Sequence, residues 1–315
     1  MILGIDTSNY TTSAALLASS GELVTQKRER LEVERGERGL RQSEAVFQHV
    51  NKLPQVIAEV VEGKKGELTK VVVSTRPTSQ ADSYMPVFRV GEGQAKSLAS
   101  ILDLPLFEVS HQESHLMAGV WSAGLDVEKF LAIHLSGGTS ELLKVSNKQG
   151  LGFVVEVLGT SQDLHAGQFI DRVGVELGFS FPAGPSLERL AWEGELGEVV
   201  IPSAVDGYQM SFSGPTSAAM RAIEAGEKKA DIALAVQQAI ANTVEKVLRK
   251  AIGKEDVTDI LIVGGVAANQ YIRARLKKRL EHPGVGAKLY FADPKWSSDN
   301  AVGTAALALE LETKS

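Results

Sequence analysis

Short apolar stretches of the chain alternate with polar turns in an order that occurs twice. Residues 2–7, 12–18 and 21–28 are apolar or alternating runs, and the turns between them predict three successive antiparallel strands. Helical spacing of apolar positions follows over 43–62. The rest of this half predicts a strand at 71–73, a helix at 95–102 and a short strand beginning near 104.

The same order restarts after residue 130. Runs at 131–135, 142–145 and 153–157 predict a second meander of three strands. The elements expected after it are helices around 167–178, 213–224 and 230–252, a strand at 260–263, a helix at 268–281, a strand at 288–291 and a terminal helix from about 299. This repetition indicates an internal duplication in an α/β protein of two lobes, with a ligand crevice between them.

The predicted lobes are residues 1–109 and 110–298, with the helix at about 299–315 packing back on the first lobe. A length of 315 residues with 43% hydrophobic side chains allows either one large core or two medium ones. Since the first strand begins at Ile2, we expect no signal peptide, and no apolar run is long enough to span a membrane.

The chain contains no cysteine, which excludes disulfides, thiolate zinc sites and cysteine nucleophiles. Any bound metal must therefore use histidine or carboxylate ligands. The absence of cysteine also agrees with a cytoplasmic location. A net charge of −6 argues against broad nucleic-acid binding, so a nucleic-acid substrate would need a local basic face or a partner protein.

His111 and His115 are the sharpest chemical signal. Their i, i+4 spacing places both imidazoles on one side of a helix, whereas Glu113 points to nearly the opposite side. Glu113 therefore does not fit a zincin protease, where the glutamate directly follows the first histidine. Asp299 is a candidate third ligand, and a helix cap is the alternative role for it. Two histidines with one carboxylate suit Fe(II) or Zn(II).

Glycine-rich and hydroxyl-rich turns follow several predicted strands. Asp6-Thr7-Ser8 in the first half and Ser136-Gly137-Gly138 in the second could each present N–H groups and hydroxyls to phosphate, or form plain hairpin turns. Asn269 follows a Gly-Gly turn, where it could contact a nucleotide, cap a helix or do both. Asp171 could accept ribose hydroxyls near Gly184, or pair with a neighbouring arginine.

Five basic residues gather at 273–279, opposite a buried stripe of Ile272, Leu276 and Leu280. Such a run is usually a solvated helix face. Contact with RNA is the alternative.

In order and spacing, these residues resemble the TsaD/Gcp family over nearly the whole chain. The matching motifs are Gly4-to-Ser8, His111-to-His115, Ser136-Gly137-Gly138, Gly167 with Phe169-to-Asp171, Pro182-to-Pro185, Phe212-Ser213-Gly214, Gly264-Gly265-Val266 with Ala268-Asn269, and Asp299-Asn300-Ala301. The resemblance implies an actin/hexokinase-like fold, in which two ribonuclease H-like lobes enclose a nucleotide cleft.

The resemblance also implies a site and a reaction. His111, His115 and Asp299 would hold the metal, and an adenine nucleotide or threonylcarbamoyl-adenylate, with magnesium as a further candidate ion, would bind to His134, Leu135, Ser136, Gly137, Gly138, Asp171, Gly184 and Asn269. The family transfers threonylcarbamoyl from an adenylate to N6 of adenosine 37 in tRNA. In bacteria it acts with TsaB-like and TsaE-like proteins, a related two-lobed protein and a small ATPase.

The chain departs from the family pattern at several loops. The departures are Thr75-to-Gln80 in place of Gly-Pro-Gly-Leu, Asp163-Leu164 in place of an acidic pair, Gln168 for glutamate, Thr139 for histidine and Thr216 for lysine. They favour a divergent paralogue and leave an alternative function, a regulatory protein that binds nucleotide and metal without transferase activity. A sugar or acetate kinase is disfavoured, because paired histidines at metal spacing have no part in phosphoryl transfer to a hydroxyl.

Overall fold

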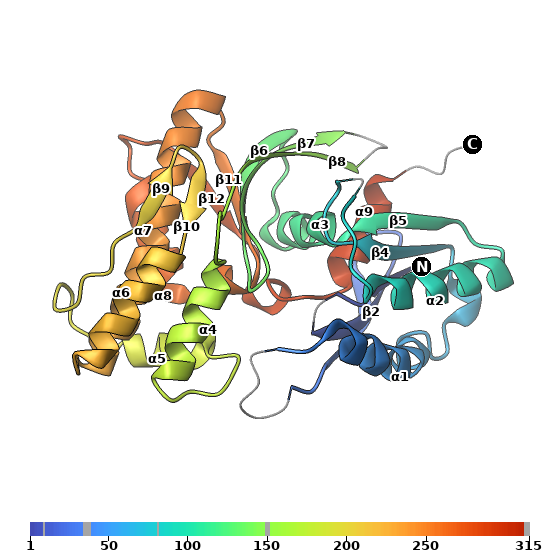
Figure 1. Cartoon of the computed structure of the whole chain (residues 1–315). Helices are drawn as coiled ribbons and strands as arrows, with labels where there is room; N and C mark the ends of the chain where they lie inside the picture. Colours follow the sequence, from blue (N-terminus) through green and yellow to red (C-terminus); the bar gives the residue numbers. More distant parts are fainter. Residues whose placement is uncertain (9, 34–38, 81, 149–151, 312–315) are drawn as a thin grey trace. The chain divides into compact units, whose positions relative to one another are not determined.

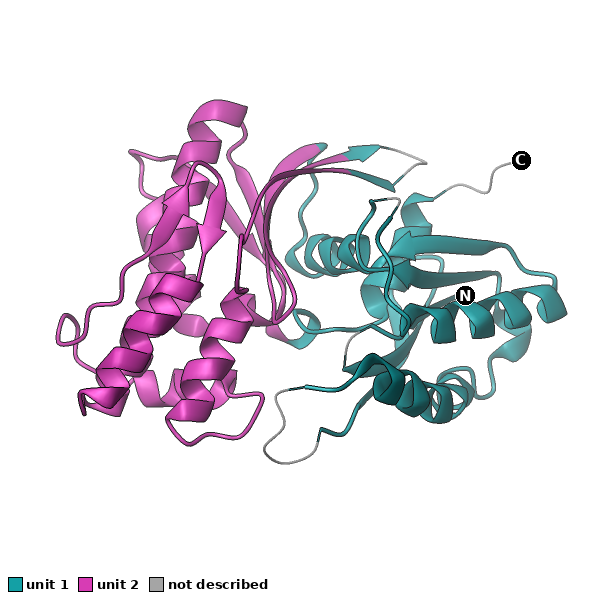
Figure 2. Cartoon of the chain, viewed as in Figure 1, with its two compact units in different colours: residues 1–128, 147–154, 295–315 teal, residues 129–146, 155–294 magenta. Residues whose placement is uncertain are grey.

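A computed structural model of the chain describes residues 1–8, 10–33, 39–80, 82–148 and 152–311. It divides into two compact units (Figures 1 and 2). Unit 1 comprises Met1–Glu128, Asn147–Val154 and Lys295–Ser315, and unit 2 comprises Lys129–Ser146 and Val155–Pro294. The sequence placed the end of the first lobe at residue 109. Unit 1 instead continues to Glu128, because the helix after residue 110 packs against the C-terminal helix.

Unit 1 is built on a five-stranded sheet with the order β3-β2-β1-β4-β5. Its strands are β1 Ile2–Asp6, β2 Thr11–Leu17, β3 Leu23–Arg30, β4 Lys70–Arg76 and β5 Leu106–Ser110. Its helices are α1 Gln42–Val60, α2 Phe88–Leu102, α3 His111–Ala123 and α9 Val302–Glu310, with the short 3-10 turns η1 Lys65–Glu67 and η3 Pro294–Trp296.

The two faces of this sheet carry different side chains because successive residues of a strand alternate sides. Leu3 and Ile5 of β1 belong to a core that also contains residues of α1 and α2. Gly4 lies on the other face, where a Cβ would meet Ala301 and Ala305 at the start of α9. Asp6 shares the side of Gly4, so β1 directs a buried carboxylate toward the face that α3 and α9 cover.

Unit 2 has a second five-stranded sheet, with the order β12-β11-β6-β7-β8. Its strands are β6 Lys129–Leu135, β7 Ser140–Lys148, β8 Gly152–Thr160, β11 Asp259–Val263 and β12 Lys288–Phe291. The other elements are α4 Ala166–Glu176, α5 Gly184–Ala191, the hairpin β9 Ala204–Asp206 and β10 Gln209–Ser211, α6 Ser213–Glu224, α7 Lys229–Glu255, η2 Gly265–Ala268 and α8 Gln270–Leu280. Alternate residues of β6 and β11 pack with these helices in one large core.

Both sheets are connected in the same way, which confirms the duplication predicted from the sequence. In unit 1, β1 pairs antiparallel with β2 and parallel with β4, which pairs parallel with β5. In unit 2, β6 pairs antiparallel with β7 and parallel with β11, which pairs parallel with β12. No helix among the described residues is both long and apolar enough to cross a membrane.

Candidate metal and nucleotide sites

Helix α3 begins with a capping box that fixes the orientation of its first turn. Ser110 Oγ accepts a hydrogen bond from the N–H of Glu113, and the Glu113 carboxylate accepts one from the N–H of Ser110. Glu113 is therefore used as a cap, on the side of the helix away from the two imidazoles. This geometry agrees with the argument from spacing against a zincin protease.

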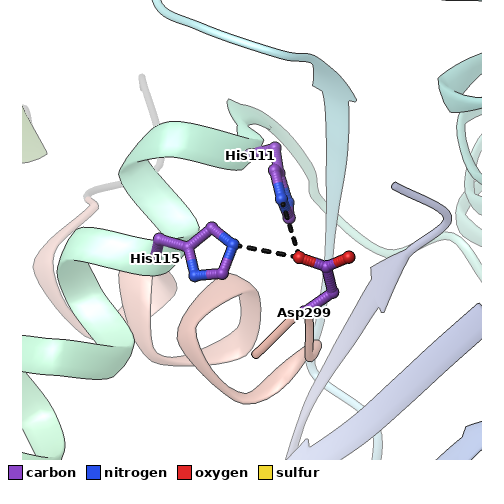
Figure 3. Close-up of side chains that lie close together, drawn as sticks. All are labelled: His111, His115 and Asp299. Atoms are coloured by element: carbon purple, nitrogen blue, oxygen red, sulfur yellow. Dashed lines mark hydrogen bonds and ion pairs between the residues drawn. The ribbon is translucent and has the colours of Figure 1, made fainter. Parts of the chain in front are cut away.

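The structure brings His111, His115 and Asp299 together within unit 1 (Figure 3). Nε2 of His111 lies 3.4 Å from Oδ1 of Asp299, and Nε2 of His115 lies 3.2 Å from the same oxygen. Both imidazoles are buried, and the candidate ligand atoms of the three residues all lie within 4.8 Å of one another. The cluster joins residues that are 184 positions apart in the sequence.

The separations fit the donor atoms of one small cation. Nitrogen and oxygen ligands lie about 2.1 Å from a zinc or iron ion, which puts neighbouring donors about 3.0 Å apart at right angles and about 3.4 Å apart at a tetrahedral angle. The measured 3.2 and 3.4 Å fall in this range. Two imidazole nitrogens and one carboxylate oxygen are also a donor set that such ions accept.

The charges of the cluster favour a cation as well. Burial disfavours the imidazolium of His111, but the Asp6 and Asp299 carboxylates outweigh it and raise the pKa of His111 to about 10. Burial and the positive charge of His111 lower the pKa of His115. Burial alone would raise the pKa of Asp299, yet its contacts with both histidines lower it. Two carboxylates beside one imidazolium leave a net negative site.

Asp6 is a member of this cluster that the sequence analysis did not identify. Its Oδ1 lies 3.3 Å from Nδ1 of His111 and also accepts a hydrogen bond from Ser74, while Oδ2 accepts one from Ser8. Asp6 ends β1 and Ser74 lies in the parallel strand β4, so the carboxyl ends of neighbouring strands bring them together. That rule could have linked Asp6 to the residues after β4 and β5.

The hydroxyl groups of the first turn are engaged inside unit 1. Thr7 Oγ1 donates to the carbonyl of Val87 and accepts from the N–H of Gly91, and Ser8 donates to Asp6. Thr12 contacts the ring of His49. Within unit 1 these hydroxyl groups hold the turn in place, and Ser8 supports Asp6.

Asp299 is not the cap of the C-terminal helix. The N-cap position of α9 is Ala301, and the side chain of Asn300 accepts a hydrogen bond from the N–H of Val302. Asn300 also donates to the carbonyls of Trp296 and Ser298, which holds the loop around Asp299. The carboxylate of Asp299 is consequently available to the two histidines.

The residues proposed for a nucleotide all lie in unit 2, near the carboxyl ends of β6 and β11. His134 ends β6 with Leu135 and is paired with Val263. In the turn that follows, Ser136 N–H donates to the carbonyl of Thr139, and Gly138 N–H donates to Ser136 Oγ. The N–H of Gly167 at the start of α4 donates to the carbonyl of Ser136, so this turn and α4 are in contact.

The glycines here divide into two kinds. Gly264 has a φ of +95°, and a Cβ on it would collide with the carbonyl of Leu135, while a Cβ on Gly167 would lie 2.7 Å from Cα of Gly137. These two glycines are required by the packing of the protein itself. Gly137, Gly138 and Gly265 have no neighbour within 4 Å of a built Cβ. Their open surroundings are what a group approaching the backbone would need.

Of the three remaining predicted residues, Asp171 lies in the middle of α4, Gly184 begins α5 and Asn269 precedes α8. Asp171 Oδ1 accepts a hydrogen bond from the N–H of Ala183, and burial raises the pKa of Asp171. Gly184 begins α5 directly after Ala183, and its nearest neighbour would be Ile170 at 3.8 Å from a Cβ. Asn269 caps α8 through Oδ1, which accepts from Ile272, so its predicted capping role is confirmed.

Comparison with known proteins gives consistent matches along the chain. A family model described as TsaD, tRNA N6-adenosine threonylcarbamoyltransferase, matches residues 25–306. The protein of that name from Archaeoglobus fulgidus is 30% identical over 264 residues, which span 84% of this chain and 77% of the relative. The one from Syntrophomonas wolfei is 30% identical over 319 residues, spanning 98% and 91%.

Solved structures share the fold at low sequence identity. Component A of the Acidaminococcus fermentans (R)-2-hydroxyglutaryl-CoA dehydratase aligns with 98% of this chain and 97% of its own chain. The TM-score is 0.59 and the sequence identity 18%. A ROK family glucokinase from Streptomyces griseus aligns with 97% of this chain and 98% of its own chain, with a TM-score of 0.54 and 15% sequence identity. These likenesses confirm the predicted actin/hexokinase-like fold.

Proposed function

The chain belongs to the TsaD family of tRNA N6-adenosine threonylcarbamoyltransferases, and we propose that it transfers threonylcarbamoyl from threonylcarbamoyl-adenylate to N6 of adenosine 37 in tRNA. The observation that supports this most within the molecule is the convergence of His111, His115 and Asp299 on one point of unit 1. The motif departures in the surrounding loops leave these three side chains in place.

We assign the three residues as ligands of one divalent metal ion, with Fe(II) and Zn(II) as the candidates. Three protein ligands leave coordination positions open for substrate oxygen atoms. When bound, such an ion supplies Lewis-acid polarisation of the carbamoyl carbonyl as AMP leaves.

The protein's own residues prepare this site. Asp6 accepts a hydrogen bond from Nδ1–H of His111, so the Nε2 proton is the one that a metal ion would displace, on the side of the ring that faces Asp299. Ser8 and Ser74 donate to Asp6 and keep it ionised, and Asp6, His111 and His115 are buried. His111 is thereby held in one orientation before any metal binds.

Unit 2 supplies the proposed adenylate site. A phosphate would approach the backbone of Gly137 and Gly138 from the side on which a built Cβ meets no atom within 4 Å. Asp171 would accept ribose hydroxyls, and the Nδ2 group of Asn269 is left to donate because Oδ1 already caps α8. Magnesium is a further candidate ion beside the phosphate. His134, Leu135, Ser136 and Gly184 complete the proposed lining.

The proposal extends to partners and location. Because the family acts on tRNA, we place the protein in the cytoplasm, and we expect TsaB-like and TsaE-like proteins as partners.

Complementation tests the proposed function. The chain is expressed in cells depleted of their own synthase, and threonylcarbamoyl-adenosine is measured by mass spectrometry of digested tRNA. The unchanged chain should restore the nucleoside, whereas His111→Ala and Asp299→Asn should each reduce it by at least about 100-fold, because each removes a metal ligand.

His282→Ala is the matched control, since it removes an exposed imidazole in unit 2 and should leave the yield unchanged. Absence of the nucleoside despite soluble, folded protein would contradict the proposed transferase activity. Metal content of the purified variants separates loss of the ion from loss of folding.

A further inference from the structure

Positive charge is concentrated in two short helical segments of unit 2. Residues 246–254 of α7 contain four basic side chains, and residues 270–280 of α8 contain five. These 20 residues hold nine of the chain's 33 basic side chains and none of its 39 acidic ones, although the whole chain has a net charge of −6. We call the two segments together the α7–α8 cationic band.

The two segments lie on neighbouring helices and meet at Arg249 and Arg279. Arg275 of α8 donates through Nε and Nη2 to Oδ1 of Asn242 in α7, and Arg279 contacts Glu245 one turn further along. Arg249 of α7 donates back to the carbonyl of Arg279. These contacts hold α7 beside α8 in unit 2, and α7 also packs against the β9–β10 hairpin (Figure 1).

Little of this charge is neutralised within the protein. Arg249 and Arg279 share the single carboxylate of Glu245. Arg273 is half-buried, donates to the carbonyls of Ala267 and Ala292, and is attracted by Asp293 and Glu188. Lys250 and Lys278 are exposed. A surface that keeps several cations in water without carboxylate partners attracts a polyanion.

The band lacks the features of a protein-binding patch. Its residues Val247, Leu248, Ile272, Leu276 and Leu280 are buried in the unit 2 core, and Ile252 and Tyr271 are partly buried against it. Protein interfaces are usually anchored by exposed aromatic or aliphatic side chains with few lysines, whereas nucleic-acid surfaces are rich in lysine and arginine. The chemistry of the band therefore favours a phosphate backbone over an acidic protein.

We propose that the α7–α8 cationic band binds the phosphate backbone of the tRNA substrate. This inference rests on the proposed function, which supplies tRNA as the polyanion. It explains how an acidic chain binds RNA, because the positive charge is gathered on one face. Phosphate contacts of this kind position the substrate and carry no base specificity.

Salt-dependent binding tests the proposal. The affinity of the full-length chain for tRNA is measured by fluorescence anisotropy from about 50 to about 300 mM KCl. Lys250→Gln combined with Lys278→Gln should weaken binding by about tenfold at low salt and reduce the slope of log affinity against log salt by about 1 to 2. Neither residue touches the proposed metal or nucleotide sites.

Lys65→Gln combined with Lys148→Gln is the matched control, because it removes the same charge from exposed positions outside the band, in η1 and at the end of β7. This control should change affinity by less than about twofold. Equal weakening in both double variants, or no tRNA binding by the unchanged chain, would overturn the proposal. Equal affinity of the unchanged chain for polyglutamate and for tRNA would also overturn the proposal, because the surface would then fit acidic peptides.

The experiments distinguish an error in the proposed tRNA-binding surface from an error in the proposed transferase function. If the chain is not a transferase, no threonylcarbamoyl-adenosine forms, while the difference in tRNA affinity between the two double variants persists. If the band does not bind tRNA, the nucleoside forms in the complementation assay and the two double variants bind tRNA equally.

Discussion

Asp6 connects the first strand of the chain to the candidate metal site. Its carboxylate is fully buried and lies 3.3 Å from Nδ1 of His111. We predict that Asp6→Asn, which keeps the size of the side chain and removes its charge, weakens metal binding by about 10- to 100-fold. Competition with a chromophoric zinc chelator measures this affinity directly.

Ser8→Ala serves as the control for this prediction. It removes a hydrogen bond to Oδ2 of Asp6 and leaves the contact of Oδ1 with His111 in place. We expect a loss of affinity several-fold smaller than for Asp6→Asn. Equal affinities of Asp6→Asn and the unchanged protein would show that Asp6 does not orient His111.

The raised pKa of His111 predicts that metal uptake releases a proton. Folding raises this pKa from 6.5 to about 10, so at pH 8 the metal-free folded site holds a proton that the unfolded chain has lost. The stability contributed by that proton is complete below about pH 6.5 and is lost as the pH rises through about 10. A metal ion must displace the proton, so apparent affinity should rise with pH across this window.

Titration calorimetry at pH 8 in two buffers of different ionisation enthalpy counts the protons. We expect about one proton released for each zinc ion bound. In Asp6→Asn the number should fall, because the carboxylate that raises the pKa of His111 is gone. A binding enthalpy that is the same in both buffers for the unchanged protein would refute the prediction.

Among the elements, the pair of α3 and α9 determines whether the metal ligands meet. Gly303 lies in the first turn of α9, four residues after Asp299, and a Cβ there would collide with the carbonyl of Ser114 on α3. Ser114 lies between the two histidines in the sequence and accepts a hydrogen bond from Thr304. The close approach of the helices therefore places Asp299 opposite His111 and His115.

We predict that Gly303→Ala lowers the free energy of unfolding by about 2 to 4 kcal/mol, because backbone atoms on both helices must move apart. Metal affinity should fall as well, since α3 and α9 carry or adjoin all three ligands. Urea unfolding followed by circular dichroism, together with chelator competition, measures both effects.

Gly253→Ala provides the comparison, because Gly253 is also helical and has nothing within 4 Å of a built Cβ. This substitution should raise stability by up to about 1 kcal/mol, since alanine favours the helix. If the two alanine variants had the same stability, the close packing of α3 on α9 would not limit the fold.

Local sequence patterns predicted most helices and strands, and the elements that they did not predict correctly have physical reasons. The buried strand β4 and helix α6 were found because their apolar spacing is clear. Helix α2 begins at Phe88, seven residues before the predicted start, because its first turns contain two glycines that obscure the pattern. The hairpin β9–β10 has strands of three residues, too short to show alternation.

The site was only partly predictable for a different reason. His111 and His115 share one helix, so their spacing reveals them without any knowledge of the fold. Asp6 lies 105 positions before His111 in the sequence. The two meet because of the order of the strands in the sheet, which local sequence patterns do not reveal. Asp299 lies 184 positions from His115, so no local pattern could distinguish its role as a ligand from that of a helix cap.

At the scale of the whole molecule, the duplicated units carry different chemistry. Unit 1 holds the three candidate metal ligands, and the eight residues proposed for the nucleotide all lie in unit 2. The two sheets share a strand order, yet the carboxyl end of β1 has Asp6 with internally bonded hydroxyls, while the end of β6 has glycines with open surroundings. One ancestral pattern thus supports two kinds of site.

This division predicts that two ligands protect different parts of the chain from hydrogen exchange. A ligand at about 100 times its dissociation constant slows exchange through local opening by about 100-fold, but only in segments whose opening releases the ligand. Zinc added to chelator-treated protein should therefore protect residues 106–123 and 295–310 of unit 1. AMP should protect residues 134–140 and 264–272 of unit 2. Exchange followed by mass spectrometry resolves these peptides, and zinc protection confined to unit 2 would contradict the assignment of the metal to His111, His115 and Asp299.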